Sequence, residues 1–134
     1  MASARLRPCL LDTDVVIDFL RGHPKAGAAF EELPEDCAVS AVTVAELHVG
    51  VREGAERVAL ESLLATLTVV DLDAALAAEG GLLRRDWGKS HGVGLNDALI
   101  AATAVHTGRV LWTLNDKHYP MLQRASCRRP YTKA

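Results

Sequence analysis

The sequence predicts an α/β domain of three layers, in which helices cover both faces of a central, mainly parallel sheet of four to five strands. The chain has 134 residues, a length at which one domain buries a core of its own. Its composition is aliphatic, with 49% hydrophobic but only 4% aromatic residues. Short apolar runs alternate with longer segments of helical spacing, which is typical of strand and helix units in a parallel sheet. We therefore expect a single domain over residues 1–134.

The first unit is a strand followed directly by a helix. Residues 8–12 (PCLLD) form a short apolar run that ends in an acid, which is typical of a buried strand. Thr13 or Asp14 is expected to cap the next helix, and Gly22 to end it. Two further elements are expected next, a short helix over 24–34 and a brief strand over 38–40.

The alternation continues through the middle of the chain. Thr43 and Glu46 have the spacing of a capping box, so a helix is expected to begin at Thr43. Gly54 is expected to end this helix. Apolar spacing, β-branched residues and glycines then predict a helix through 58–64, a strand over 68–72, a helix over 74–87, a loop over 88–94, a helix over 95–108, a strand over 110–112 and, as an option, an edge strand in the tail.

Charge distinguishes the body of the chain from its C-terminal tail. The formal net charge is −2 and the sequence pI is about 6.2, so the chain lacks the basic surplus of a passive nucleic-acid binder. From residue 124 onward there are basic residues and no acids. Arg124, Arg128 and Arg129 are therefore candidates for phosphate contacts, with ordinary surface groups as the alternative.

Cysteine spacing and hydropathy indicate the compartment. The three cysteines are widely spaced and form no C-x-x-C motif, which argues against a disulfide framework and against a structural zinc site. No apolar stretch reaches the roughly 18 residues of a membrane span, and no apolar signal core follows the first arginines. We expect a cytoplasmic protein with no membrane partner.

Four acidic side chains lie where strands end or where the following helices begin: Asp12, Glu46, Asp97 and Asp116. These points gather at one edge of a parallel α/β sheet, so the four carboxylates are expected to converge there. Their mutual repulsion in a partly buried cleft requires a counter-ion. Carboxylate oxygens suit Mg²⁺, for which Mn²⁺ can substitute, and this pattern predicts a cation-dependent site.

Each acid also has a structural interpretation. Asp12 is a possible helix cap, and Glu46 is equally well explained as the capping-box partner of Thr43. Asp97 favours the helix dipole, but that gain of about 0.3–1 kcal/mol is small for an acid on the most apolar helix. Asp116, taken alone, is more typical of a turn.

Other chemistry-bearing residues form no comparable set. The five histidines show no H-x-x-x-H or H-E-x-x-H spacing, so a histidine zinc site is not predicted. No G-x-S-x-G elbow is present, which argues against a serine hydrolase.

Four segments carry these acids in a recurring arrangement: LLDTDVVIDFL (10–20), SAVTVAEL (40–47), LNDALIAATA (95–104) and WTLNDKHYPML (112–122). In this order they resemble the motifs of the PIN-domain nucleases, and in particular the VapC-like toxins of type II toxin–antitoxin pairs. The fourth segment departs from the family pattern, because His118 and Tyr119 stand where the family usually has an Asp-Phe pair.

The resemblance implies a function and a set of site residues. It implies an endoribonuclease that hydrolyses RNA phosphodiesters, with Mg²⁺ bound by Asp12 and Asp97 and with Glu46 and Asp116 completing the acidic pocket. It also implies a homodimer and a VapB-like antitoxin whose C-terminal segment occupies the active-site groove. The supporting residues that it implies are Thr13, Ser40, Asn96, Thr113 and Asn115.

Two other classes of protein remain open from the residues. LLDTDVV (10–16) also resembles the first motif of haloacid-dehalogenase-like phosphatases, with Asp12 as nucleophile and Asp14 as acid. A non-catalytic cation-binding α/β interaction module, such as a receiver, is the second alternative, although Asp71 and Lys117 match its pattern only loosely. Turnover of RNA distinguishes the three.

Overall fold

A single five-stranded parallel sheet forms the middle layer of the computed structural model, which describes residues 7–133. The strand order is β3-β2-β1-β4-β5, so the first strand lies at the centre. Every neighbouring pair is parallel, which confirms the sheet type expected from the alternation of strands and helices. The strands are β1 (Cys9–Leu11), β2 (Cys37–Ser40), β3 (Thr68–Val70), β4 (Val110–Trp112) and β5 (Cys127–Arg128).

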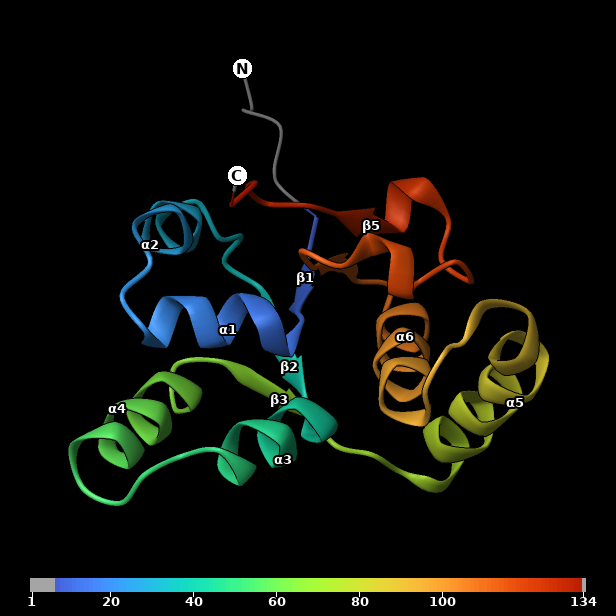
Figure 1. Cartoon of the computed structure of the whole chain (residues 1–134), viewed down its shortest axis with the longest axis horizontal. Coiled ribbons are helices and arrows are strands. Elements are labelled where there is room, and N and C mark those ends of the chain that lie inside the picture. Colours follow the sequence, from blue (N-terminus) through green and yellow to red (C-terminus); the bar gives the residue numbers. More distant parts are fainter. Residues whose placement is uncertain (1–6, 134) are drawn as a thin grey trace.

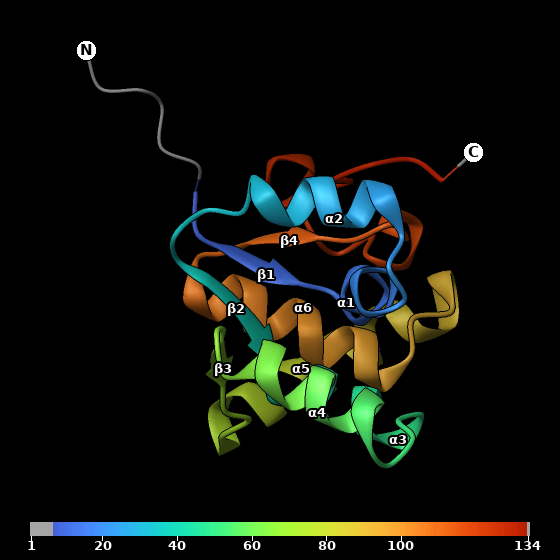
Figure 2. The ribbon, with the colours of Figure 1, turned by 90° about the vertical axis from the view of Figure 1, so that its left-hand side faces the viewer.

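Helices cover both faces of this sheet, as Figures 1 and 2 show. α1, α2 and α4 lie on one side, and α6 lies on the other with α5 packed on it. α3 follows β2 and contributes side chains to both apolar cores. The helices are α1 (Thr13–Leu20), α2 (Pro24–Glu31), α3 (Ala41–Val49), α4 (Ala55–Leu64), α5 (Ala74–His91) and α6 (Leu95–Thr107), with the 3₁₀ turns η1 (Asp116–His118) and η2 (Arg124–Ser126).

The central strand is apolar throughout because both of its faces are covered. Cys9 and Leu11 point into the core beneath α1, α2 and α4, whereas Leu10 points into the core beneath α6. All three side chains are fully buried. The run in residues 8–12 that predicts a buried strand is therefore the centre of the molecule, and it places Asp12 at the carboxyl edge of the sheet.

The start of α3 corrects one prediction. α3 begins at Ala41, and the Ser40 hydroxyl caps it by accepting a hydrogen bond from the Val42 amide at 3.0 Å. Thr43 therefore lies within the first turn and is fully buried, and Glu46 faces the site instead of reaching back to a cap. The capping box of Thr43 and Glu46 is wrong.

Two helix ends also differ from the sequence expectations. α3 ends at Val49, and Gly54, with φ of +96°, precedes α4 instead of closing α3. α5 continues through Gly88 to His91, so the loop expected over 88–94 is confined to residues 92–94. Gly92, with φ of +67°, ends α5 by donating its amide to the Gly88 carbonyl, which makes it the glycine that the turn requires.

The two adjacent glycines of α5 are expected to respond differently to alanine. A Cβ added at Gly80 meets Leu99 of α6 at 2.4 Å from Cδ2 and 3.1 Å from Cα, whereas one added at Gly81 meets nothing within 4 Å. Gly80→Ala is therefore expected to lower the free energy of unfolding by about 1–3 kcal/mol through overpacking. Gly81→Ala, the matched control, is expected to raise it by up to about 1 kcal/mol. Urea unfolding measures both, and equal effects would contradict the close packing of α5 on α6.

Among residues 7–133, no helix is long and apolar enough to cross a membrane. The expectation about an N-terminal signal core concerns the first residues, which lie outside the described part, so it stays a prediction. The same holds for the assignment of all of residues 1–134 to one domain.

Candidate active site

Asp12 is the most tightly held acid at the carboxyl edge of the sheet. It directly follows β1, its side chain is 6% exposed, and it caps α1 through the Thr13 amide at 2.8 Å. Its other oxygen, Oδ2, accepts hydrogen bonds from the hydroxyls of Thr113 at 2.7 Å and Tyr119 at 2.9 Å. The cap interpretation of Asp12 is thus correct, and the cap expected at Thr13 or Asp14 is wrong. The cap occupies one carboxylate oxygen, so it does not exclude a site role for Asp12.

The segment after β4 locks this arrangement through Asp14. Asp14 Oδ2 accepts from the Leu114 amide at 3.0 Å and from the Asn115 side-chain amide at 2.9 Å. The Asn115 amide in turn donates to the Thr113 hydroxyl at 3.0 Å. The first turn of α1 and residues 113–115 therefore form one hydrogen-bonded unit that fixes Asp12, and Thr113 and Asn115 belong to it.

Glu46 reaches the same edge from α3. The Thr13 hydroxyl donates to Glu46 Oε1 at 2.7 Å and lies 3.0 Å from the Thr43 hydroxyl. The Asn96 amide donates to Glu46 Oε2 at 3.3 Å, which links α3 to the start of α6. Ser40 acts one step further back, because its cap fixes the first turn of the helix that carries Glu46.

Asp97, in the first turn of α6, faces Asp12 across one hydroxyl. Tyr119 Oη lies 3.3 Å from Asp97 Oδ1 and 2.9 Å from Asp12 Oδ2. His118 Nδ1 lies 3.5 Å from the other oxygen, Asp97 Oδ2. The structure therefore brings Asp12, Glu46 and Asp97 to one edge, with Asn96 between the last two.

Burial without full charge compensation shifts the pKa values of these acids. Burial, followed by the charge of Asp14, raises the pKa of Asp12 from 3.8 to about 6. Burial also raises the pKa of Asp14, against the hydrogen bonds that it accepts. For Asp97 burial again raises the pKa, and the imidazole of His118 opposes the shift. The site is a patch of partly desolvated carboxylates with a deficit of positive charge.

This donor set fits a hard divalent cation. Within residues 7–133, no three His, Cys, Asp or Glu side chains lie close enough to hold one metal ion together. Two carboxylates, those of Asp12 and Asp97, share one hydroxyl between them. Mg²⁺ in proteins is commonly held by one or two carboxylates and otherwise by water. The charge deficit and the oxygen donors of Asp12 and Asp97 fit such an ion.

Asp116 is placed differently from the other three acids. Its exposed carboxylate pairs with Arg129 at 2.8 Å, and this hydrogen bond holds the pKa of Asp116 below its usual value. The fourth site acid therefore stays a prediction that the geometry does not favour. Arg128 stacks over the Trp112 ring at 4.6 Å, so two of the three tail arginines expected to contact RNA make contacts within the protein, whereas Arg124 is exposed in η2.

Sequence reasoning did not place Tyr119 or His118 in the site. Tyr119 is 2% exposed, and its hydroxyl is buried between two carboxylates that are distant in the sequence. The available signal was their position in the fourth motif, where they replace the usual Asp-Phe pair. Polar side chains at these two positions of the fourth segment could therefore have been predicted to lie near the site acids.

The parallel sheet with acids at its carboxyl edge is the arrangement of a known family. The family model for the PIN domain matches residues 9–122, and the chain belongs to the PIN-domain family. Two curated relatives are Ribonuclease VapC19 and Ribonuclease VapC10, both of Mycobacterium tuberculosis. Each is 39% identical to this chain; the first alignment covers 84% of this chain and 92% of the relative, and the second 86% and 88%.

A solved structure shows the same architecture. It is titled a toxin–antitoxin complex from Klebsiella pneumoniae, and its matching chain superposes with a TM-score of 0.79 at 28% identity, over 92% of this chain and 98% of that chain. The match confirms the three-layer fold.

The comparisons support neither alternative class. The phosphatase alternative requires Asp14 as a proton donor beside Asp12, but the Asp14 carboxylate accepts hydrogen bonds from Leu114 and Asn115. These contacts give Asp14 a structural partner on the segment after β4.

Proposed function

We propose that this protein is a cation-dependent endoribonuclease and the toxin of a VapBC-type toxin–antitoxin pair. The observation that carries the proposal is the meeting of Asp12 and Asp97 at one buried hydroxyl, in a chain 39% identical to proteins named VapC ribonucleases. Mg²⁺ is the proposed cofactor, with Mn²⁺ as a substitute, because the donors are carboxylate oxygens. RNA is the proposed substrate.

Different residues of the site have different proposed roles in the reaction. Asp12 and Asp97 hold the cation, and Thr113 fixes Asp12 by donating to its Oδ2 at 2.7 Å. Glu46, held by Thr13 and Asn96, would orient the attacking water. When bound, the cation supplies a more acidic water and offsets the charge that develops on the phosphate oxygens.

The activity is tested by incubating partner-free protein with a structured RNA pool, in Mg²⁺, in Mn²⁺ and in EDTA. A phosphomonoester substrate is run in parallel. We expect RNA fragments with either cation and none in EDTA. Phosphate release from the monoester without RNA cleavage would favour the phosphatase, and RNA cleavage unaffected by EDTA would contradict the cation site.

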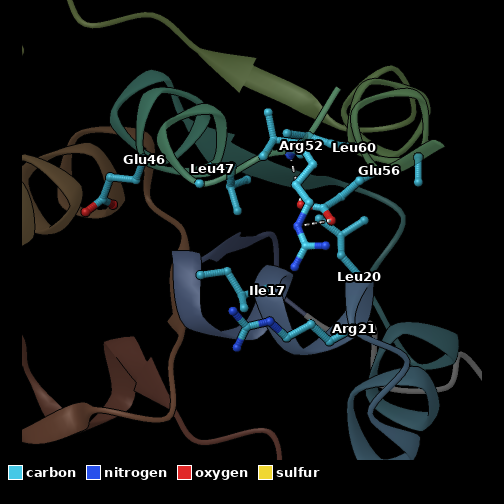
Figure 3. A pocket seen from close by; sticks show the side chains of 11 residues that line it. Ile17, Leu20, Arg21, Glu46, Leu47, Arg52, Glu56 and Leu60 are labelled. Atoms are coloured by element: carbon cyan, nitrogen blue, oxygen red, sulfur yellow. Dashed lines mark hydrogen bonds and ion pairs between the residues drawn. The ribbon is translucent and has the colours of Figure 1, made fainter. Parts of the chain in front are cut away.

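A groove beside the site fits the proposed antitoxin. Figure 3 shows this groove, about 470 Å³, between α1, α3 and α4, with Glu46 at one end. Its lining includes the apolar side chains of Leu20 and Leu60 and the exposed guanidinium of Arg21, whereas Arg52 is paired with Glu56 at 3.9 Å. We propose this groove as the site of the C-terminal segment of a VapB-like antitoxin, since an apolar groove with Arg21 at its rim suits an amphipathic segment that presents an acidic side chain to this arginine.

Charge reversal in the groove is expected to weaken the antitoxin complex. Arg21 is an exposed lining residue, and Arg21→Glu is expected to raise the dissociation constant of the cognate antitoxin about tenfold, the effect of about 1.4 kcal/mol. The control is Arg85→Glu on α5, which removes an exposed arginine paired with Asp86. Calorimetric titration measures both, and equal affinities for the two variants would place the antitoxin elsewhere.

The family resemblance also predicts a homodimer, and the cysteine spacing and hydropathy predict a cytoplasmic location. Both stay predictions for this chain. Light scattering of the partner-free protein tests the first, and fractionation of cells that express the complete protein tests the second.

A further inference from the structure

The hydroxyl of Tyr119 is the polar group that joins the two proposed cation ligands. Tyr119 follows η1, and its ring packs in the core beneath α6 with Leu10 and Ile100. Its hydroxyl reaches Asp12 Oδ2 at 2.9 Å and Asp97 Oδ1 at 3.3 Å. Residues from β1, from α6 and from the segment after β4 thus meet at one oxygen atom.

The buried hydroxyl of Tyr119 finds its polar partners in the carboxylates of Asp12 and Asp97, whereas the apolar core contacts only the ring. The ring alone fills the apolar space, and a phenylalanine ring fills the same space. A buried hydroxyl without a partner is unfavourable, so its contribution depends on the oxygens that it contacts.

The hydroxyl also determines which carboxylate oxygens remain available. It contacts Oδ2 of Asp12 and Oδ1 of Asp97, one oxygen from each group. Asp12 Oδ1 is then shared with the Thr13 amide alone among the described contacts, and Asp97 Oδ2 lies 3.5 Å from His118 Nδ1. The hydroxyl has one hydrogen to donate and its shorter contact is with Asp12, so it lies against one oxygen of each acid, and the second oxygen of each acid retains acceptor capacity for a ligand.

We propose that Tyr119 is a positioning residue of the cation site, whose hydroxyl holds Asp12 and Asp97 in the orientation in which both bind one divalent cation. This inference rests on the proposed function. It assigns to Tyr119 the orienting role that hydrogen-bonding partners of metal ligands have in general. The pair of carboxylates is thereby prearranged for the cation.

The test compares the two tyrosines of the chain. Tyr119→Phe removes the bridging hydroxyl and keeps the ring. Tyr131→Phe is the matched control, because the Tyr131 hydroxyl also contacts a carboxylate, Asp18 Oδ2 at 2.9 Å, but away from the cation ligands. Mn²⁺ affinity is measured without RNA from the paramagnetic resonance signal of free Mn²⁺, and circular dichroism checks that each variant is folded.

We expect Tyr119→Phe to weaken Mn²⁺ binding about tenfold, in the range found when partners of metal ligands are removed, and Tyr131→Phe to leave it unchanged. An affinity of Tyr119→Phe within about twofold of the unchanged protein would overturn the inference. If the unchanged protein binds no Mn²⁺, the inference falls together with the proposed cation site. RNA cleavage by the unchanged protein distinguishes the two cases. If only the inference fails, the unchanged protein still cleaves RNA in the presence of the cation, and if the proposed function fails, it does not.

A second measurement does not depend on the folding of Tyr119→Phe. Incorporation of fluorotyrosine gives one fluorine resonance for each tyrosine, and Tyr131→Phe assigns them. We expect addition of Mg²⁺ to shift the Tyr119 resonance and not that of Tyr131. An unmoved Tyr119 resonance in protein that binds the cation would contradict the contact between this hydroxyl and the ligands.

Discussion

Replacement of Asp12 with Asn is expected to abolish cation-dependent RNA cleavage, with a loss of at least about a hundredfold. Asn removes the charge that holds the cation but keeps one oxygen for the cap of α1. The hydroxyls of Thr113 and Tyr119 can rotate to accept from the new amide, so the fold is expected to persist. Cleavage of a labelled RNA measures the loss.

The matched control for this variant is Asp18→Asn. Asp18 lies on the same helix and is also buried, but its carboxylate binds Tyr131 and Lys133 at a distance from Asp97. This variant is expected to cleave RNA at the rate of the unchanged protein when both are folded. Full activity of Asp12→Asn, or equal losses in the two variants, would remove Asp12 from the reaction.

Asp12 is also expected to make the cation-free protein less stable as the pH rises from about 4 to about 6. Burial and the charge of Asp14 raise its pKa from 3.8 to about 6 in the folded state. At a pH between these two pKa values, Asp12 is ionised in the unfolded chain but still protonated in the folded protein, so ionisation stabilises the unfolded state. The contribution of Asp12 to the free energy of unfolding therefore falls by about 2 kcal/mol over this range and stays low at higher pH.

Urea unfolding in EDTA at about pH 4 and about pH 7 measures this dependence. Relative to the unchanged protein, Asp12→Asn is expected to gain about 2 kcal/mol in free energy of unfolding between the two pH values. For Asp18 the stability changes with pH in the opposite direction. Burial raises its pKa, but hydrogen bonds from Tyr131 and Lys133 outweigh burial and lower it. Its contribution to the free energy of unfolding is therefore present above the unfolded pKa and is lost as the pH falls. A difference between Asp12→Asn and the unchanged protein that does not vary with pH would contradict the buried charge.

Addition of the cation at about pH 7 extends the same argument. Mg²⁺ binds the folded protein and compensates the ionised carboxylates, so it is expected to raise the thermal unfolding temperature of the unchanged protein. Asp12→Asn is expected to show no such rise.

The parts of the fold that follow local rules were predictable from the sequence. The apolar run before Asp12 predicts β1 because a strand covered on both faces is apolar throughout. Gly22 and Gly108 end α1 and α6 with φ of +77° and +64°, as their positions indicate. The convergence of Asp12, Glu46 and Asp97 follows from the geometry of a parallel sheet.

The errors arose where a tertiary contact competes with a local pattern. Thr43 and Glu46 match a capping box, but Thr43 is buried against Thr13, and Ser40 caps the helix instead. The ion pair of Asp116 with Arg129 joins residues on opposite sides of η2, which spacing along the chain does not reveal. The position of Tyr119 between two acids depends on the packing of β1 and α6 in the same way.

The central claim is that Asp12 and Asp97 hold the cation that RNA cleavage requires. The most direct test is the cleavage rate of one RNA over a titration of Mn²⁺, with the unchanged protein and Asp97→Asn in parallel. We predict a rate that rises to saturation for the unchanged protein, returns to background in EDTA, and stays at background for Asp97→Asn at every concentration. Saturating cleavage by Asp97→Asn, or cleavage by the unchanged protein in EDTA, would contradict the claim.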